Sequence, residues 1–314
     1  MPARSAEEIK GQLTFLVVPA AAVLLRGAAD LRLLGKLWRL SALYLSLRGF
    51  GEFFRSGGGL DARLKAGLSV HMTYAGLLMV LVLVLLARAL SPEEPRRSRL
   101  LDGGVAALGT LAIALTLTRN AYLGLAAGIL VLVLLWRPKS LFVLAPVGLV
   151  VFLAAPAVVR DRARSAFDPA DETVRDRVAM WKAGRLMVRD HPLFGVGPGR
   201  IKEVYPDYRQ PGFVDPHVGH LHNNLVMTAA ETGLPSAAFY LWLVGAVVAG
   251  GVRRARAPGE DAVKPFARGA VAAFAALFVA GMFEYNFGDV EILIPSLVLA
   301  VVPFVGGRPS PPAD

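Results

Sequence analysis

The sequence predicts an all-α protein: a polytopic membrane helical bundle of about nine transmembrane helices, with a small, mainly helical extracytoplasmic loop domain. Two observations predict this fold class. The 314 residues have a mean hydropathy of +0.52, and only 18% of them are charged, which is too apolar for an ordinary soluble domain of this length. Apolar runs such as LLMVLVLVLLARAL, at 77–90, are also too long and too uniform for strands of a soluble sheet.

Nine apolar runs come close to the roughly 20 residues that cross a bilayer. They lie at 10–28, 37–54, 68–88, 100–118, 120–136, 139–158, 234–251, 266–284 and 290–306. The first is interrupted by Pro19. The second carries Arg39 and Arg48 and also fits a helix that lies along the membrane surface. No signal-peptide cleavage pattern precedes the first run, so we expect a retained helix there.

Basic residues in the short loops predict the orientation of the bundle. The segments PRRSR at 95–99, RPK at 137–139 and RRAR at 253–256 follow alternate spans, so one cytoplasmic side accommodates all three. Arg119 and the long segment 159–222 are then expected on the outer side. The net charge of +10 is therefore explained mostly by the basic residues that flank the spans on the cytoplasmic side. Because no soluble module carries a basic patch with interleaved aromatic residues, we expect no nucleic-acid partner.

The chain divides into three regions on this basis. Residues 1–158 form an N-terminal transmembrane bundle, residues 159–222 form the extracytoplasmic loop domain, and residues 223–314 supply the C-terminal transmembrane helices. Zero cysteines rule out disulfides, zinc sites with cysteine ligands and thiol nucleophiles.

The segment DETVRDRVAMWKAGRLMVRD, at 171–190, predicts a helix of about five turns in the loop domain. Asp171 or Thr173 is a suitable cap, and the following His-Pro pair ends the helix. On this helix Arg177, Trp181 and Arg185 share a face. They suit either a surface on which the tryptophan contacts the membrane and the arginines are solvated, or a binding site.

The next stretch, PLFGVGPGR at 192–200, has glycines at alternate positions: Gly195, Gly197 and Gly199. Such a stretch either turns backbone N–H groups toward an anion or forms an ordinary tight turn. It is neither a P-loop nor a dinucleotide-binding motif, because no GK[ST] follows it and no βαβ unit contains it.

Three histidines, His217, His220 and His222, fall within six residues where the charged segment gives way to an apolar one. The pattern leaves three interpretations open: zinc ligands, polar residues without chemistry, or a general base that deprotonates a hydroxyl at the membrane surface. Neither HExxH nor another zinc motif with a carboxylate accompanies them, which disfavours a metal.

Three segments, TRNAYLG, RDRVAMWKAGRLMVRDHPLFGVGPG and HLHNNLVMTAAETGLPS, resemble the O-antigen ligase and O-antigen polymerase superfamily. The resemblance covers roughly residues 68–300 and is most specific at His222-Asn223, followed after nine residues by Gly233. Ser236 departs from the Gly, Thr or Tyr usual three residues after that glycine. Arg119, which opens a transmembrane helix, and Arg177, four residues before a tryptophan, also match.

The resemblance implies a metal-independent glycosyltransferase without cofactors in the bacterial inner membrane. The donor would be an undecaprenyl-diphosphate-linked glycan, and the acceptor a hydroxyl of a glycolipid or a glycan. The alternatives are a polymerase of the same superfamily and a non-enzymatic transporter of lipid-linked glycans. Relatives commonly have about twelve spans, so an N-terminus shortened by about three helices is a further expectation.

The resemblance also implies a role for each matched residue. His222 would take the proton from the attacking hydroxyl. Arg119 and Arg177 would bind the diphosphate, with Arg185 as a helper. His220 and Asn223 would orient His222 or contact the acceptor.

Overall fold

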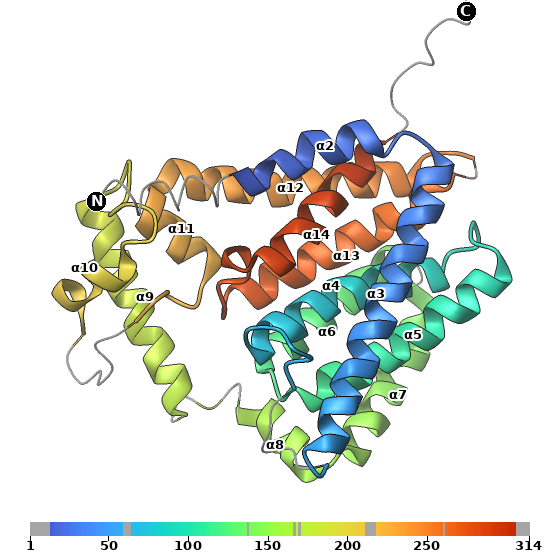
Figure 1. The fold of residues 1–314 in the computed structure, drawn as a ribbon, viewed down its shortest axis with the longest axis horizontal. Coiled ribbons are helices and arrows are strands. Elements are labelled where there is room, and N and C mark those ends of the chain that lie inside the picture. The colour runs from blue at the N-terminus through green and yellow to red at the C-terminus, as the bar shows by residue number, and fades with distance from the viewer. Residues whose placement is uncertain are drawn as a thin grey trace, which may run out of the picture.

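A computed structural model describes residues 13–58, 64–136, 138–165, 168, 171–210, 218–259 and 261–305. In this part of the chain every regular element is helical (Figure 1). The elements are η1 (Leu13–Leu16), α2 (Val17–Leu24), α3 (Ala28–Arg55), α4 (His71–Ala89), α5 (Arg96–Leu115), α6 (Arg119–Trp136), η2 (Pro138–Ser140), α7 (Leu141–Ala154), α8 (Ala157–Arg164), α9 (Glu172–Asp190), α10 (Ile201–Tyr208), α11 (Asn224–Thr232), α12 (Leu234–Arg256), α13 (Val263–Gly281), η4 (Asn286–Gly288), α14 (Val290–Val301) and η5 (Val302–Phe304).

Five of these helices are long and apolar enough to cross a membrane: α4, α5, α6, α12 and α13. They correspond to five of the predicted spans and confirm a multi-pass, all-helical protein. The other predicted spans coincide with helices that are shorter or carry more charge. The α7 helix has 14 residues, and the apolar segments Leu13–Leu24 and Val290–Phe304 are also short. The number of nine transmembrane helices therefore stays a prediction.

Helices α4 and α13 form the centre of the bundle, and most of their residues are buried. The α13 helix packs on α4, α6 and α12, and α4 also packs on α3 and α5. Two glycines bring α6 close to α13. A Cβ atom at Gly124 would lie 2.8 Å from the carbonyl oxygen of Ala276, and one at Gly128 would lie 2.9 Å from that of Ala272. Small residues at this spacing are a common means of close helix packing in membranes.

A second core lies at one end of the bundle, where α9, α10 and α11 pack together. Its buried apolar residues include Met187, Ile201, Tyr205, Leu221 and Met227. The core therefore draws on α11 as well as on the predicted loop domain. The predicted helix at 171–190 is confirmed as α9, with Asp171 at its N-cap. We call this end of the bundle the α9 end; α4, α6, α12 and α14 begin there, and α5 and α13 end there (Figure 1).

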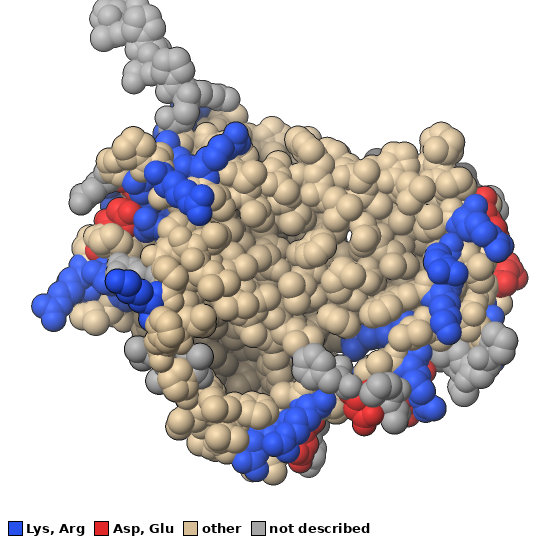
Figure 2. Space-filling view, turned by 180° about the vertical axis from the view of Figure 1, so that it is seen from behind, with Lys and Arg blue, Asp and Glu red and all other residues tan. Residues whose placement is uncertain are grey.

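Charged side chains gather toward two opposite ends of the molecule, with a broad face that lacks Lys, Arg, Asp and Glu between them (Figure 2). At the end opposite α9, Arg268 of α13 binds Glu93, in the α4–α5 connection, through two N–O contacts of 2.8 and 2.9 Å. This pair places the start of α13 beside the start of α5. The basic segments 96–99 and 253–256 therefore share one end, as the predicted orientation requires; the side of the membrane stays a prediction.

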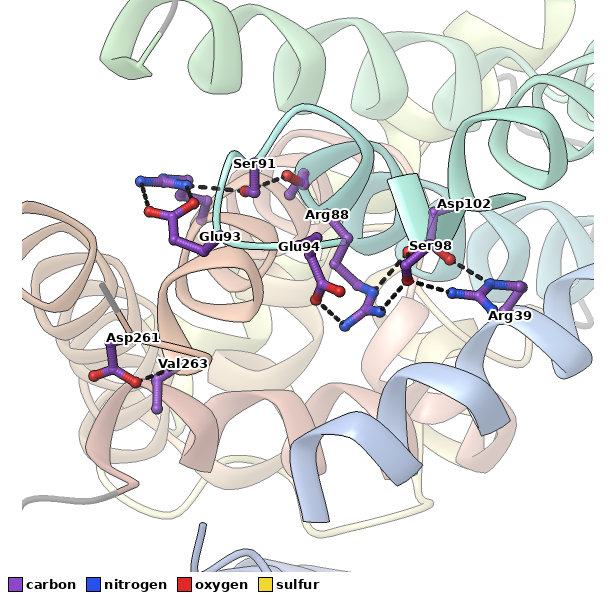
Figure 3. Close-up of polar contacts among 11 residues, drawn as sticks. Arg39, Arg88, Ser91, Glu93, Glu94, Ser98, Asp102, Asp261 and Val263 are labelled. Carbon is purple, nitrogen blue, oxygen red and sulfur yellow. Dashed lines mark hydrogen bonds and ion pairs between the residues drawn. The ribbon is translucent and has the colours of Figure 1, made fainter. Parts of the chain in front are cut away.

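A buried ion-pair network ties α3, α4 and α5 together at the same end (Figure 3). The Asp102 carboxylate is fully buried and accepts hydrogen bonds from Nε of Arg39 and, at 3.0 Å, from Nε of Arg88. Ser98 accepts from both guanidinium groups, and Glu94 lies 2.6 Å from Arg88. Arg39 interrupts an apolar run in the sequence, and this network accounts for its presence there.

The network predicts a large loss of stability in Asp102→Asn. The substitution removes the carboxylate charge between two arginines, and breaking a buried ion pair costs about 3–5 kcal/mol. Thermal unfolding of the purified protein in detergent measures the effect. Asp161→Asn is the matched control, because the Asp161 side chain is 70% exposed and its loss should cost less than about 0.5 kcal/mol. Equal melting temperatures for the two variants would contradict this account of the network.

Candidate active site

Helix α11 explains the spacing of the His-Asn and glycine residues. Asn223 is its N-cap: Oδ1 accepts from the Val226 N–H at 3.0 Å, and Nδ2 donates to the Met282 carbonyl at 2.9 Å. After the nine residues of α11, Gly233 ends the helix with φ at 89°, where a Cβ atom would lie 2.1 Å from the Leu193 carbonyl oxygen. A side chain is excluded there by both φ and space. The nine residues between Asn223 and Gly233 are therefore the whole of helix α11.

The alternating glycines pack against the end of α11. The N–H groups of Val196 and Gly197 donate to the carbonyls of Ala230 and Glu231, at 2.8 and 3.0 Å. The N–H of Gly199 donates to the Glu231 carboxylate at 2.9 Å. Because these N–H groups are occupied, the geometry favours the tight turn over the anion-binding loop.

His222 and Glu284 form the centre of the site. Nδ1 of His222 lies 3.0 and 3.1 Å from the two carboxylate oxygens of Glu284, in the loop that follows α13. His222 has φ at 47°, a left-handed conformation that costs a non-glycine residue on the order of 1–2 kcal/mol. Asn223 lies next to it and fixes the start of α11. The fold thus holds His222 in a strained position against a buried carboxylate.

His220 lies near the same carboxylate. Its Nδ1 lies 3.7 Å from Oε1 of Glu284, and its ring centroid is 4.0 Å from that of His222. Burial lowers the pKa of His220 below its usual 6.5, and the charge of His222 lowers it further. His220 therefore tends to remain neutral beside His222.

Glu284 is the residue that sequence reasoning missed. Its side chain is only 5% exposed. Burial raises the pKa of Glu284, but the hydrogen bond from His222 and the histidine charges outweigh burial and leave the pKa below its usual value. The sequence did hold a signal: an acidic residue at the end of an apolar run, inside the predicted span 266–284, and charges at such positions are often functional.

Arg177 of α9 approaches Glu284 from the loop domain. Its Nη2 lies 4.0 Å from Oε2 of Glu284, and its buried Nε has no hydrogen-bond partner among the described residues. Burial lowers the pKa of Arg177, and the Glu284 charge opposes that shift. The guanidinium therefore has an N–H group that donates no hydrogen bond to any described residue.

Arg119, the first residue of α6, is buried and held by the segment before α9. Its two Nη atoms bind the carboxylate of Asp171 at 2.9 and 3.1 Å, and Nη1 also donates to the carbonyl and hydroxyl oxygens of Ser165. The hydrogen bond from Arg119 is the main reason that the pKa of Asp171 is lowered. Because the charges of Arg119 and Asp171 both act on Arg177, the two arginines belong to one electrostatic environment.

Arg185 lies apart from this cluster. It lines a shallow hollow on α9 together with Trp181 and Gln210, and it makes no ion pair with any residue that the structure describes. His217 lies outside the described residues. The structure therefore brings Arg177, His220, His222 and Asn223 together, connects Arg119 to them through Asp171, and leaves Arg185 on a separate patch.

A hollow of about 350 Å³ adjoins the cluster. His220, Glu284, Tyr285, Asp289, Glu231 and Met72 are among the residues that line it. Carboxylates and an imidazole accept hydrogen bonds, and sugar hydroxyls donate them. The hollow therefore suits a polyhydroxylated molecule beside the histidines.

His220, His222 and Glu284 also have the arrangement of a candidate metal site, since their ligand atoms all lie within 4.8 Å of one another. Two imidazoles and one carboxylate match the donor set of some catalytic zinc sites. However, the Arg177 guanidinium contacts the same carboxylate and would repel a divalent cation. The sequence around the histidines contains no zinc motif with a carboxylate; in the structure Glu284, from the loop after α13, supplies that carboxylate.

Residues 104–241 match the family model described as O-antigen ligase. Over these residues the chain is similar to the O-antigen ligase family. A comparison with curated proteins finds no match. The ligase family region includes Arg119, Arg177 and the His220–Asn223 segment, and it ends before Glu284. The match and the apolar helices together support a multi-pass membrane protein that is similar to O-antigen ligases.

Proposed function

We propose that this chain transfers a glycan from an undecaprenyl-diphosphate-linked donor to a hydroxyl of a glycolipid or glycan acceptor, at the outer face of the bacterial inner membrane. The observation that carries the proposal is the hydrogen-bonded pair of His222 and buried Glu284. An ionised Glu284 accepts the Nδ1–H of His222, which leaves Nε2 unprotonated and available as a general base. The family match supports the reaction class.

In the proposed reaction, the acceptor hydroxyl attacks the anomeric carbon of the donor sugar. The bond from that carbon to the diphosphate oxygen breaks as the new glycosidic bond forms. The hydroxyl proton passes to Nε2 of His222, and Glu284 stabilises the resulting imidazolium. The bond-pair electrons leave with the polyprenyl diphosphate, whose growing negative charge requires cationic groups.

Arg177 is the more direct candidate for contact with the diphosphate, because its buried Nε has no partner among the described residues. Both Nη atoms of Arg119 bind Asp171, so Arg119 acts on the donor chiefly through its charge and by holding α6 against the start of α9. Arg185 lies on the outer surface of α9 and would meet only a distant part of the donor.

We expect Arg177→Gln to weaken use of the donor. Loss of a charge-assisted contact to the diphosphate should lower kcat/KM for the donor by about tenfold. Arg175→Gln is the matched control, because Arg175 is an exposed arginine on the same helix. The measurement is the initial transfer rate at several donor concentrations. Unaltered kinetics in Arg177→Gln would refute the diphosphate role.

We also expect transfer to continue without a metal. Dialysis against EDTA should leave the rate within about twofold of that of untreated protein, because Arg177 beside Glu284 disfavours a bound cation. Loss of activity on chelation, with recovery on addition of Zn²⁺, would instead assign His220, His222 and Glu284 as metal ligands.

Analysis of the products tests the proposed function itself. The purified protein is given the lipid-linked glycan and a glycolipid acceptor, and the products are separated by mass. A ligase joins the intact glycan to the glycolipid. A polymerase lengthens the glycan on the polyprenyl diphosphate. A transporter moves the donor lipid without any new covalent product, and that result would overturn the proposal.

A further inference from the structure

Two further hollows lie on the face of α4 that is opposite to α6, the helix that begins with Arg119. The α3 helix packs on α4 and α5, whereas α6 packs on α13 and α4, so α4 separates the two regions. Between α3, α4 and α14 runs an apolar groove of about 440 Å³. The residues that line it include Leu37, Trp38, Tyr44, Leu77, Leu81 and Ile294, and none of its lining residues is charged.

At the α9 end of this groove is a basic hollow of about 500 Å³, lined by Arg48, Arg55 and Lys65 and by one carboxylate, Glu52. The Glu52 carboxylate already accepts hydrogen bonds from the backbone N–H groups of Lys65 and Ala66, at 3.2 and 2.7 Å. Among the described residues, the three basic side chains form no ion pair. The described residues that line this hollow therefore carry a net positive charge where the apolar groove ends.

The backbone of the hollow is strained. Ala66 has φ at 50°, and the described chain contains only two other non-glycine residues with positive φ, Leu117 and His222. Those two lie at the α9 end beside Arg119 and Glu284. Glu52 fixes the strained turn by binding the N–H of Ala66. Strain that the surrounding contacts maintain in this way is common at ligand sites.

The two hollows adjoin each other, and the basic hollow lies near the candidate site. Tyr44 lines the apolar groove, and its hydroxyl accepts a hydrogen bond of 2.7 Å from Arg48 of the basic hollow. Leu68 lines the basic hollow, and Val70, two residues later, lines the hollow that contains His220 and Glu284. An apolar chain in the groove would therefore place a phosphate in the basic hollow, at the same end of the bundle as the histidines.

We propose that these hollows bind the acceptor as a phosphate-bearing lipid, with its chain in the apolar groove and its phosphate at Arg48, Arg55 and Lys65. This inference rests on the proposed function. Charge complementarity selects an anionic head group, and the mainly apolar, uncharged lining of the groove selects a lipid. Transfer between two membrane-anchored substrates needs two lipid sites, and the donor arginines lie across α4. The second site is therefore assigned to the acceptor.

Photolabelling tests the lipid site without the need for catalysis. The full chain is placed in nanodiscs of phosphatidylcholine with a phosphatidic acid probe that carries a diazirine in one acyl chain, or with the matching diacylglycerol probe. The phosphatidic acid probe should label residues 34–45 about tenfold more than diacylglycerol does, because only the former pairs with the arginines. Equal labelling by the two probes would overturn the proposal.

The variant Arg48→Gln/Arg55→Gln should reduce labelling by phosphatidic acid to the level of diacylglycerol. Both arginines are exposed, so the variant should fold, and Arg55→Gln alone provides a milder version. The matched control is Arg32→Gln/Lys36→Gln, two exposed basic residues nearer the other end of α3. Labelling that is lost equally in the control would show a general charge effect and contradict the site.

Transfer kinetics distinguish the acceptor from bulk lipid. The double variant should raise the KM for a phosphorylated glycolipid acceptor about tenfold and leave the donor KM unchanged. Loss of labelling without any change in acceptor KM would assign the site to bulk phospholipid and overturn the acceptor role. If the wild-type protein is labelled but transfers no glycan at all, the proposed function and the acceptor role are both contradicted. The lipid-binding site itself is still supported by the labelling.

Discussion

Replacing His222 by alanine lowers the rate of glycan transfer by about 100- to 10,000-fold, the contribution usual for a general acid–base group. The physical reason is that the acceptor hydroxyl then has no positioned base to take its proton. Donor binding should persist, because Arg177 and Arg119 are untouched. The measurement is single-turnover transfer with saturating donor and acceptor, which reports the chemical step rather than product release.

His191→Ala is the matched control for this experiment. His191 caps the end of α9 through its backbone and is exposed, so its loss should leave the single-turnover rate unchanged. His222→Ala also relieves the left-handed strain at residue 222 only slightly, since alanine carries a Cβ atom as well. A wild-type rate in His222→Ala would remove His222 from the mechanism.

Replacing Glu284 by glutamine lowers kcat by about 10- to 100-fold, the range typical when a partner that fixes the orientation of a functional histidine is lost. Glutamine keeps the size of the side chain but removes its charge, so the fold is preserved while the imidazolium formed in the reaction loses its counter-ion. The donor KM should remain within about twofold of the wild-type value, because the proposed contact to the donor diphosphate is made by Arg177 and not by Glu284.

The pH profile separates this role from a structural one. The Glu284 charge opposes the lowering of the His220 pKa, so its loss in Glu284→Gln makes protonation of His220 less favourable, and the acid limb of kcat/KM should move to lower pH. Glu284→Asp should restore part of the rate, because it restores the charge. Glu291→Gln, an exposed acid at the start of α14, is the control. A uniform loss of rate at every pH would indicate disturbed packing instead.

Local patterns predicted the helices well where a single segment contains its own signals. Asp171, the acidic first turn and the His-Pro stop define α9, and the apolar runs define α4, α6 and α12. The number of spans was less predictable. Length alone does not show whether a run such as 290–306, which contains Pro295, becomes a single long helix; here α14 ends at Val301 and a 3-10 turn follows.

The site was predictable only in part, for a physical reason. The histidine and arginine candidates came from motifs within short segments, but the partner that unites them lies 62 residues after His222. Glu284 fell inside the predicted span 266–284, whereas α13 ends at Gly281. The loop created by this early end turns Glu284 toward the histidines. Such a contact depends on how α11 and α13 pack, which no local pattern expresses.

We propose that His222 and Glu284 act as one unit, and a double-mutant cycle tests this most directly. Single-turnover rates are measured for wild type, His222→Ala, Glu284→Gln and the double variant. If Glu284 acts through His222, the double variant should be no slower than His222→Ala alone. If the two losses instead multiply, the residues act independently, and the dyad account is contradicted.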